Sequence, residues 1–217
     1  MHSLPPSGWR LAVYDVTLTS AAAAIPSRGA SFFYVWSGRA TVATNGSELA
    51  VGADDGTMLD GPASVTGEGI AWLYDLAPSA QPTLAGPAFS LVIARDLPAT
   101  FEGPRMFRAD RVESNPGAQT PLHGHRGPGI RRLLKGRLHA FIGDDVDRID
   151  AGDAWFETGK DWVIGKNIAE EVSAFVRVMM LPADLKGGTS SFVPATPVEG
   201  AKPRSVSYRL FGERELP

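Results

Sequence analysis

The sequence predicts an all-β protein made of two similar units in tandem. No long window places apolar residues at the i, i+3, i+4, i+7 spacing of an amphipathic helix. Many short apolar runs are instead bounded by turn residues, and one segment of the first half recurs in the second. Glycine and proline, 24 and 17 of the 217 residues, supply the frequent turns that a sandwich or barrel requires.

Short runs rich in Val, Phe, Tyr, Trp and Leu are the predicted strands. They span residues 10–17, 31–43, 47–51, 70–76, 89–93, 129–142, 154–157 and 174–181. Asn45-Gly46 and Gly143-Asp144-Asp145 are predicted hairpin turns, because these residue types accept positive φ. Residues 21–24 and 182–186 are each long enough for one helical turn.

An internal repeat divides the chain. Residues 28–39 align with residues 126–137 at a constant offset of 98. Both segments begin with Arg-Gly, continue as a strand and end with a Gly-Arg pair that starts the next strand. A hairpin turn, an acidic stretch with glycine and a final apolar strand follow in both halves, so a chance match is the weaker interpretation. The repeat predicts a first unit over 1–80, a linker over 81–87, a second unit over 88–185 and a C-terminal arm over 186–217.

Composition excludes several classes of function. The net charge is −3 and the basic residues are scattered, so no nucleic-acid partner is expected. The absence of cysteine excludes disulfides, thiolate metal sites and thiol nucleophiles, and it favours a cytoplasmic location. The longest uncharged stretch is interrupted by three prolines, so no membrane span is expected.

The main chemical signal is His123-Gly124-His125. In a strand, residues i and i+2 face the same side, so the two imidazoles could converge on one cation. Roles without a metal, such as hydrogen bonds in a loop, stay open for both histidines.

The surroundings of this pair resemble the two motifs of the cupin superfamily. The first motif, G-x5-H-x-H-x3,4-E-x6-G, is matched by Gly117, His123, His125 and Gly136. The second motif, G-x5-P-x-G-x2-H-x3-N, is matched more loosely by Gly152, Gly159 and Asn167. The resemblance implies two tandem cupin barrels (double-stranded β-helix or jelly-roll folds), a bicupin with a degenerate N-terminal cupin unit.

Two of the four usual metal ligands of a cupin are replaced in this sequence. The glutamate slot falls on Gly129, and the second-motif histidine slot falls on Val163. In the first half, Ile25 and Ser27 occupy the places of the two histidines. The resemblance therefore implies that the first unit is a structural partner barrel without a metal.

The resemblance also implies a divalent metal ion (Fe, Mn, Ni or Zn) in the C-terminal barrel. His123 and His125 are its expected ligands, and a third protein ligand is needed. Glu157 is the first candidate, because some cupins carry a glutamate just before the second-motif loop; His139 is the second and Asp161 a remote third. A hydrogen-bonded or surface role stays open for His139, and a salt bridge or a solvated edge position stays open for Glu157.

Arg131 is the candidate substrate-binding residue. Arg131 and Arg132 are expected on opposite faces of one strand, and if Gly129 faces the cavity then parity also turns Arg131 and Leu133 inward. A buried arginine needs a carboxylate partner. That partner is either Glu157, in a structural pair, or the carboxylate of a bound ligand.

Two further features are expected to serve packing or assembly. Alternating aromatic residues of the first half are interpreted as sheet or inter-barrel packing rather than a ligand cage: Phe32, Tyr34, Trp36, Trp72 and Tyr74. The arm contains one strand-like run, 205–211, which is expected to pair with a sheet edge of this chain or of a neighbour. An exchanged arm would fit the homodimer that the resemblance to cupins favours.

The predicted function is that of a metal-binding enzyme acting on a small molecule, such as a carboxylate, in the C-terminal barrel. A dioxygenase-type oxidoreductase or an isomerase-like enzyme is expected first, and decarboxylation or hydrolysis stays open by resemblance. The alternative is a non-catalytic cupin that binds or senses a small ligand, which the missing metal ligands favour. A structural protein with an empty barrel is the third hypothesis.

Overall fold

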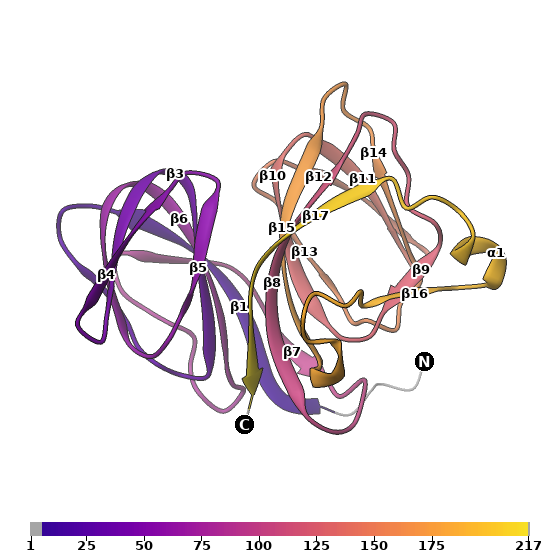
Figure 1. Ribbon diagram of the computed structural model, residues 1–217. Helices are drawn as coiled ribbons and strands as arrows, with labels where there is room; N and C mark the ends of the chain where they lie inside the picture. Colours follow the sequence, from indigo (N-terminus) through magenta and orange to yellow (C-terminus); the bar gives the residue numbers. More distant parts are fainter. Residues whose placement is uncertain (1–5, 217) are drawn as a thin grey trace. The chain divides into compact units, whose positions relative to one another are not determined.

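The computed structural model describes residues 6–216, so residues 1–5 of the expected first unit and residue 217 of the arm lie outside the described chain. The described residues form the predicted all-β fold (Figure 1). Their helical content is one 3-10 turn, η1 (Ala183–Leu185), and one four-residue helix, α1 (Pro197–Gly200). Within residues 6–216, no helix is long and apolar enough to cross a membrane. Backbone contacts divide the chain into two compact units, Pro6–Leu97 and Pro98–Glu215.

The first unit is a single folded sheet of seven strands. The strands are β1 (Pro6–Leu18), β2 (Ala23–Ile25), β3 (Ala30–Thr44), β4 (Ser47–Gly52), β5 (Asp55–Leu59), β6 (Ala63–Pro78) and β7 (Phe89–Pro98). The main path runs β4-β3-β6-β1-β7, while β2 pairs with β6 and β5 pairs with β3. Strands β3 and β6 bend to take several partners, as a barrel requires.

The second unit consists of two five-stranded sheets. Its strands are β8 (Arg105–Ser114), β9 (His123–His125), β10 (Gly129–Lys135), β11 (Arg137–Ile142), β12 (Asp145–Asp150), β13 (Ala154–Glu157), β14 (Val163–Asn167), β15 (Ser173–Pro182), β16 (Phe192–Pro194) and β17 (Val206–Leu216). One sheet has the order β13-β10-β15-β8-β17 and the other the order β12-β11-β14-β9-β16. The two inner faces enclose the interior of this unit.

The repeat is visible in strand register. Ser31 pairs with Leu59 in the first unit, and Gly129 pairs with Glu157 in the second, at the same offset of 98. Gly136 separates β10 from β11, whereas one continuous strand was expected over 129–142. It has φ +82°, and a Cβ there would lie 2.7 Å from the Ser173 Cβ, so only glycine fits this turn.

The described boundaries differ from those expected from composition. The expected linker, 81–87, lies inside the first unit, because β7 is hydrogen-bonded to β1. Residues 23–25 form β2 rather than part of a helical turn. The arm belongs to the second unit, where β16 pairs with β9 and β17 pairs with β8.

The interior of the first unit is filled with apolar side chains. Tyr14, Phe33 and Leu73 are fully buried members of one cluster that also contains Ile25 and Leu59. The aromatic residues singled out in the sequence form a separate set of ring contacts on alternate positions of the same strands: Phe32, Tyr34, Trp36, Trp72 and Tyr74. The first unit also buries an ion pair between Arg28 and Asp75, at 3.5 Å, but its main cluster is apolar.

Candidate functional site

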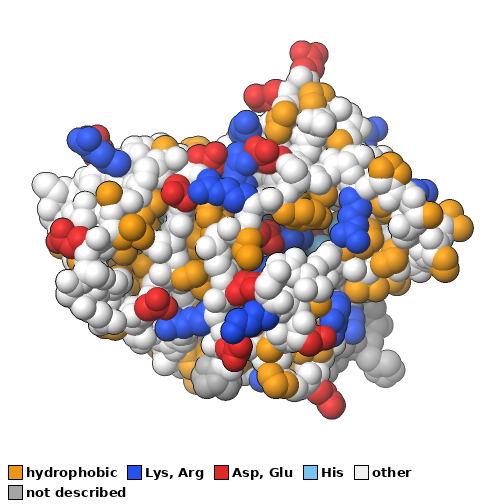
Figure 2. Space-filling model, in the orientation of Figure 1, with side chains coloured by type: hydrophobic (Ala, Val, Ile, Leu, Met, Phe, Trp, Pro, Cys, Tyr) orange, Lys and Arg blue, Asp and Glu red, His pale blue; other side chains and the backbone are white. Residues whose placement is uncertain are grey.

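A pocket opens inside the second unit, and both sheets contribute to its walls. It has about 70 Å³ of room for water-sized molecules, which corresponds to on the order of five waters or a ligand of a few heavy atoms. Figure 2 shows a recess in the surface of this unit, with a histidine visible beside Lys or Arg side chains.

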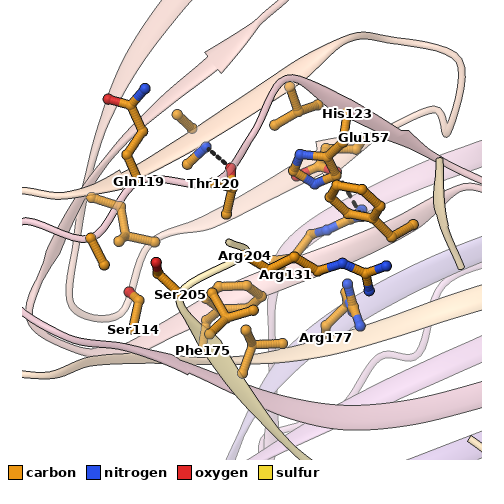
Figure 3. A pocket seen from close by; sticks show the side chains of 18 of the residues that line it. Ser114, Gln119, Thr120, His123, Arg131, Glu157, Phe175, Arg177, Arg204 and Ser205 are labelled. Carbon is orange, nitrogen blue, oxygen red and sulfur yellow. Dashed lines mark hydrogen bonds and ion pairs between the residues drawn. The ribbon is translucent and has the colours of Figure 1, made fainter. Parts of the chain in front are cut away.

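The pocket has two chemically different ends (Figure 3). Ser114, Gln119 and Thr120 give one end a neutral polar character. The other, here named the charged end, consists of His123, His125, Arg131, Glu157, Arg177 and Arg204. The charged end contains the two motif histidines together with the expected Glu157 and Arg131.

The two motif histidines are held side by side on β9. Their rings meet edge to face with centroids 4.9 Å apart, and the side chains are almost fully buried. His123 Nδ1 donates to the carbonyl of Pro121 at 2.8 Å, because a carbonyl can only accept. The proton therefore sits on Nδ1, and His123 Nε2 is left as a bare acceptor. His125 Nδ1 lies 3.3 Å from the hydroxyl of Ser191, which comes from the arm.

Glu157 is the centre of the charged end. Its Oε2 lies 2.7 Å from Arg131 Nη2 and 3.4 Å from His125 Nε2, and its Oε1 accepts from Trp155 Nε1 at 2.9 Å. The contact with Arg131 lacks the angle of a hydrogen bond, so it acts as an ion pair. Arg131 Nη1 also donates to the carbonyl of Gly129 at 2.7 Å, which fixes the guanidinium. Of the two partners considered for Arg131, the structure shows Glu157.

A second buried ion pair lies beside the first. Arg177 of β15 donates from Nε and Nη2 to the two carboxylate oxygens of Asp110 on β8, both at 2.9 Å. Strand register places Arg177 directly opposite Arg131. Each buried arginine thus has its own carboxylate, as desolvation of a guanidinium demands.

Burial and the two arginines set the protonation of this end. Burial lowers the pKa of His123, and burial together with Arg131 and Arg177 lowers the pKa of His125 well below its ordinary value. Both imidazoles are therefore neutral at neutral pH. Burial lowers the pKa of Arg131 to about 10, against the opposing effect of Glu157, so the guanidinium stays charged.

The remaining predicted site residues lie apart from this cluster. His139 lines the pocket from β11, where its ring contacts Phe141, and within residues 6–216 it has no hydrogen bond or ion pair to the motif histidines or Glu157. Asp161 accepts from the backbone and hydroxyl of Thr158, at 3.1 and 2.6 Å, so it stabilises a turn. Arg132 points to the other face of β10 and donates to the carbonyl of Gly152.

The arm contributes residues that motif spacing did not reveal. Phe192 stacks on His123 with centroids 4.6 Å apart and an angle of 15°, and the guanidinium of Arg204 lies 4.2 Å from the centre of the Phe192 ring. Ser191 supplies the hydroxyl beside His125. Arg177 could have been noticed from the sequence, because it interrupts an apolar strand, whereas the arm residues lie more than 60 positions from the histidines and follow no local pattern.

Comparison with solved structures identifies the fold. The chain matches the formate complex of oxalate decarboxylase from Lactobacillus farciminis with a TM-score of 0.61 and 15% identity, over 89% of this chain and 82% of that one. Bacillus subtilis oxalate decarboxylase, studied for its Mn(II) centres, matches with a TM-score of 0.59 and 12% identity, over 92% and 81%. A cupin 2 conserved barrel domain protein from Leptotrichia buccalis matches with a TM-score of 0.51 and 10% identity, over 82% and 86%.

The protein therefore has the cupin fold in its bicupin form. No protein-family model matches the chain, and no curated protein matches its sequence. The identities are low, so the likeness establishes the fold and leaves the activity open.

The residues present do not fit the four-ligand metal site that the cupin motifs describe. A Cβ at Gly129 would collide with the carbonyl of Val178 and lie 2.7 Å from Met179 Cγ, so a glutamate cannot occupy that slot. Val163 pairs with His123 and places an apolar side chain at the fourth slot. Glu157 approaches His125, but its oxygens are engaged by Arg131 and Trp155. Among residues 6–216, no three His, Asp or Glu side chains form a ligand cluster.

Proposed function

We propose that the second unit binds a small carboxylate-bearing molecule in its pocket. The observation that carries the proposal is the charge balance of the charged end. Arg131 is paired with Glu157 and Arg177 with Asp110, whereas Arg204 has no carboxylate partner within the described residues. The lining thus keeps one positive charge without a carboxylate partner, and a ligand carboxylate can accept hydrogen bonds from it.

Arg204 is held where a ligand can meet it. Its side chain is exposed, but the guanidinium stacks on Phe192 and donates to Ser190 Oγ at 2.9 Å. His123 Nε2, on the far side of the same stack, offers an acceptor for a ligand hydroxyl or acid proton. The pocket has room for a ligand of a few heavy atoms, and the structurally similar protein crystallised with formate is named for oxalate, an acid of that size.

Calorimetric titration with formate, acetate, oxalate and inorganic phosphate tests this proposal. Arg204→Ala is expected to weaken carboxylate binding at least about tenfold, because it removes a charge-assisted contact. Arg39→Ala is the matched control, since Arg39 is 79% exposed and lies in the first unit. Failure of every carboxylate to bind the wild-type protein, or equal binding by Arg204→Ala, would contradict the proposal.

The competing function is a metal-dependent enzyme, either a dioxygenase-type oxidoreductase or isomerase-like. One observation favours it: the Nδ1 atoms of His123 and His125 are anchored by Pro121 and Ser191, an arrangement typical of histidines that ligate through Nε2. Iron, manganese, nickel or zinc would then be held by these histidines with Glu157. Stoichiometric metal in the purified protein, with substrate-dependent oxygen uptake or product formation, would favour this function over simple binding.

The expected homodimer is likewise a proposal. β17 lies at the edge of its sheet and leaves Tyr208 and Leu210 51% and 45% exposed. Such an edge can accept a strand from a second copy. Light scattering should show a dimer that Leu210→Asp dissociates, and a monomeric wild-type protein would contradict it.

A further inference from the structure

We infer that the guanidinium of Arg131 takes the place of the divalent cation of a cupin, so that the charged end is organised by an internal cation and works without a metal. The inference does not depend on which ligand the pocket binds, and its test needs none. It rests on the positions of four side chains: His123, His125, Arg131 and Glu157.

The carboxylate of the site comes from a different strand than in the cupin pattern. In the cupin pattern the glutamate stands in the slot of Gly129. Here Gly129 is paired in register with Glu157 on the neighbouring strand, so the carboxylate reaches the same region from β13 instead of β10. Its Oε2 lies 3.4 Å from His125 Nε2, a spacing at which the two atoms could share one ion.

The guanidinium of Arg131 occupies the position beside this carboxylate. Glu157 Oε2 lies 2.7 Å from Arg131 Nη2, and the angle is that of a point-charge contact rather than of a hydrogen bond. The guanidinium is 1% exposed and is tied to the carbonyl of Gly129. A fixed positive charge therefore sits on the carboxylate oxygen that a metal would need.

Gly129 and Arg131 have complementary effects on the site. A side chain at position 129 would collide with β15, so this position cannot supply a metal-binding carboxylate. Arg131, two residues further on the same strand, faces the same side, and its guanidinium contacts Glu157. Val163 closes the fourth ligand position with an apolar group. These departures from the cupin pattern act together: two remove metal ligands, and the third supplies a cation.

The inference predicts that removing the guanidinium creates a metal site. Arg131→Met has a similar length and no charge, and it frees Glu157 to join His123 and His125 as a third ligand. Untagged wild-type protein should bind Zn²⁺ or Co²⁺ no more tightly than the His123→Ala/His125→Ala variant. Arg131→Met should gain one site that binds at least about tenfold more tightly, and its unfolding temperature should rise with added metal.

Arg131→Met/Glu157→Gln is the matched control, because it also lacks the guanidinium but has lost the carboxylate. It should gain no metal site. Stoichiometric metal in the wild-type protein that the histidine double variant loses would overturn the inference, as would a folded Arg131→Met variant without a new site. If Arg131→Met folds only when metal is present, the metal-dependent folding itself supports the inference, and the wild-type titration decides the question independently.

Discussion

The interiors of the two units carry opposite chemistry on the same frame. Strand register makes four pairs of positions equivalent: Ile25 with His123, Phe33 with Arg131, Leu59 with Glu157, and Leu73 with Arg177. In the first unit all four are apolar, buried and part of one core cluster. In the second, all four are polar and line the pocket.

This difference shows that the shared strand arrangement does not by itself determine whether a unit has a binding pocket. Apolar side chains at these positions interdigitate and close the interior of the first unit. Charged side chains must keep their partners and cannot pack as densely, so the interior of the second unit stays open around Arg131 and Arg177. The turn glycines and the register are shared, whereas the interior residues differ between the packed core and the pocket.

The largest expected effect comes from placing the second unit's carboxylate in the first unit. Leu59→Glu puts a carboxylate into the apolar cluster of the first unit, where Phe33 stands at the position equivalent to Arg131. The loss of stability should be about 5 kcal/mol or more, measured by urea unfolding. Leu49→Glu is the control, since Leu49 is 49% exposed and should lose no more than about 0.5 kcal/mol. A well-folded Leu59→Glu variant would mean that the first interior tolerates charge.

The next effect comes from the reverse change. Glu157→Leu leaves the guanidinium of Arg131 buried without its carboxylate and should cost about 3–5 kcal/mol. The double variant Arg131→Met/Glu157→Leu gives the second unit an apolar pair like that of the first. It should recover most of this loss, because removing both charges also removes the desolvation penalty. If the double variant is no more stable than Glu157→Leu, the unpaired guanidinium of Arg131 does not account for the loss of stability.

A smaller effect is expected in how the stability of each unit depends on pH. Burial lowers the pKa of His123 and His125 below the ordinary 6.5, so the unfolded chain takes up protons that the folded second unit does not. Stability should fall as pH drops below about 6.5, and His123→Asn/His125→Asn should flatten that slope. Asp75 in the first unit has the opposite effect, because burial raises its pKa above the ordinary 3.8. Its contribution to stability is present below pH 3.8 and is lost as the pH rises from 3.8 through the folded-state pKa.

Urea unfolding at several pH values measures both slopes, and Asp75→Asn isolates the second. A histidine double variant that keeps the wild-type slope between neutral and mildly acidic pH would contradict the assignment of that slope to the second unit.

Much of this comparison was predictable from the sequence. The repeat and the turn glycines predicted two all-β units, because such positions are fixed by backbone geometry that few residues tolerate. Parity along the strand correctly turned Arg131 to the side of Gly129, and a pair with Glu157 was one of the two alternatives. The offset of 98 also predicted that Ile25 stands at the position equivalent to His123.

The rest depended on contacts between distant segments. β8 was not predicted, because Arg108, Asp110 and Arg111 resemble a solvated turn until their partners across the fold are known. The expected boundary before β7 followed a proline-rich stretch, whereas backbone pairing with β1 decides where that strand belongs. The arm was expected to pair with a sheet edge, but nothing in its composition shows that Phe192 would cover the histidines.

The smallest effect tests the part of the site that the first unit lacks, the cover supplied by the arm. Ser191 donates or accepts at His125 Nδ1 over 3.3 Å, and its backbone carbonyl accepts from Arg126. Ser191→Ala removes the side-chain contacts with His125 and Met179 and keeps the backbone one, so the loss of stability should be about 1 kcal/mol. Ser190→Ala is the matched control, because Ser190 contacts Arg204 and Phe192 but neither histidine. The imidazole resonances of His125 should shift in the first variant and stay in place in the second. Unchanged resonances in Ser191→Ala would mean that β16 covers the histidines without positioning them.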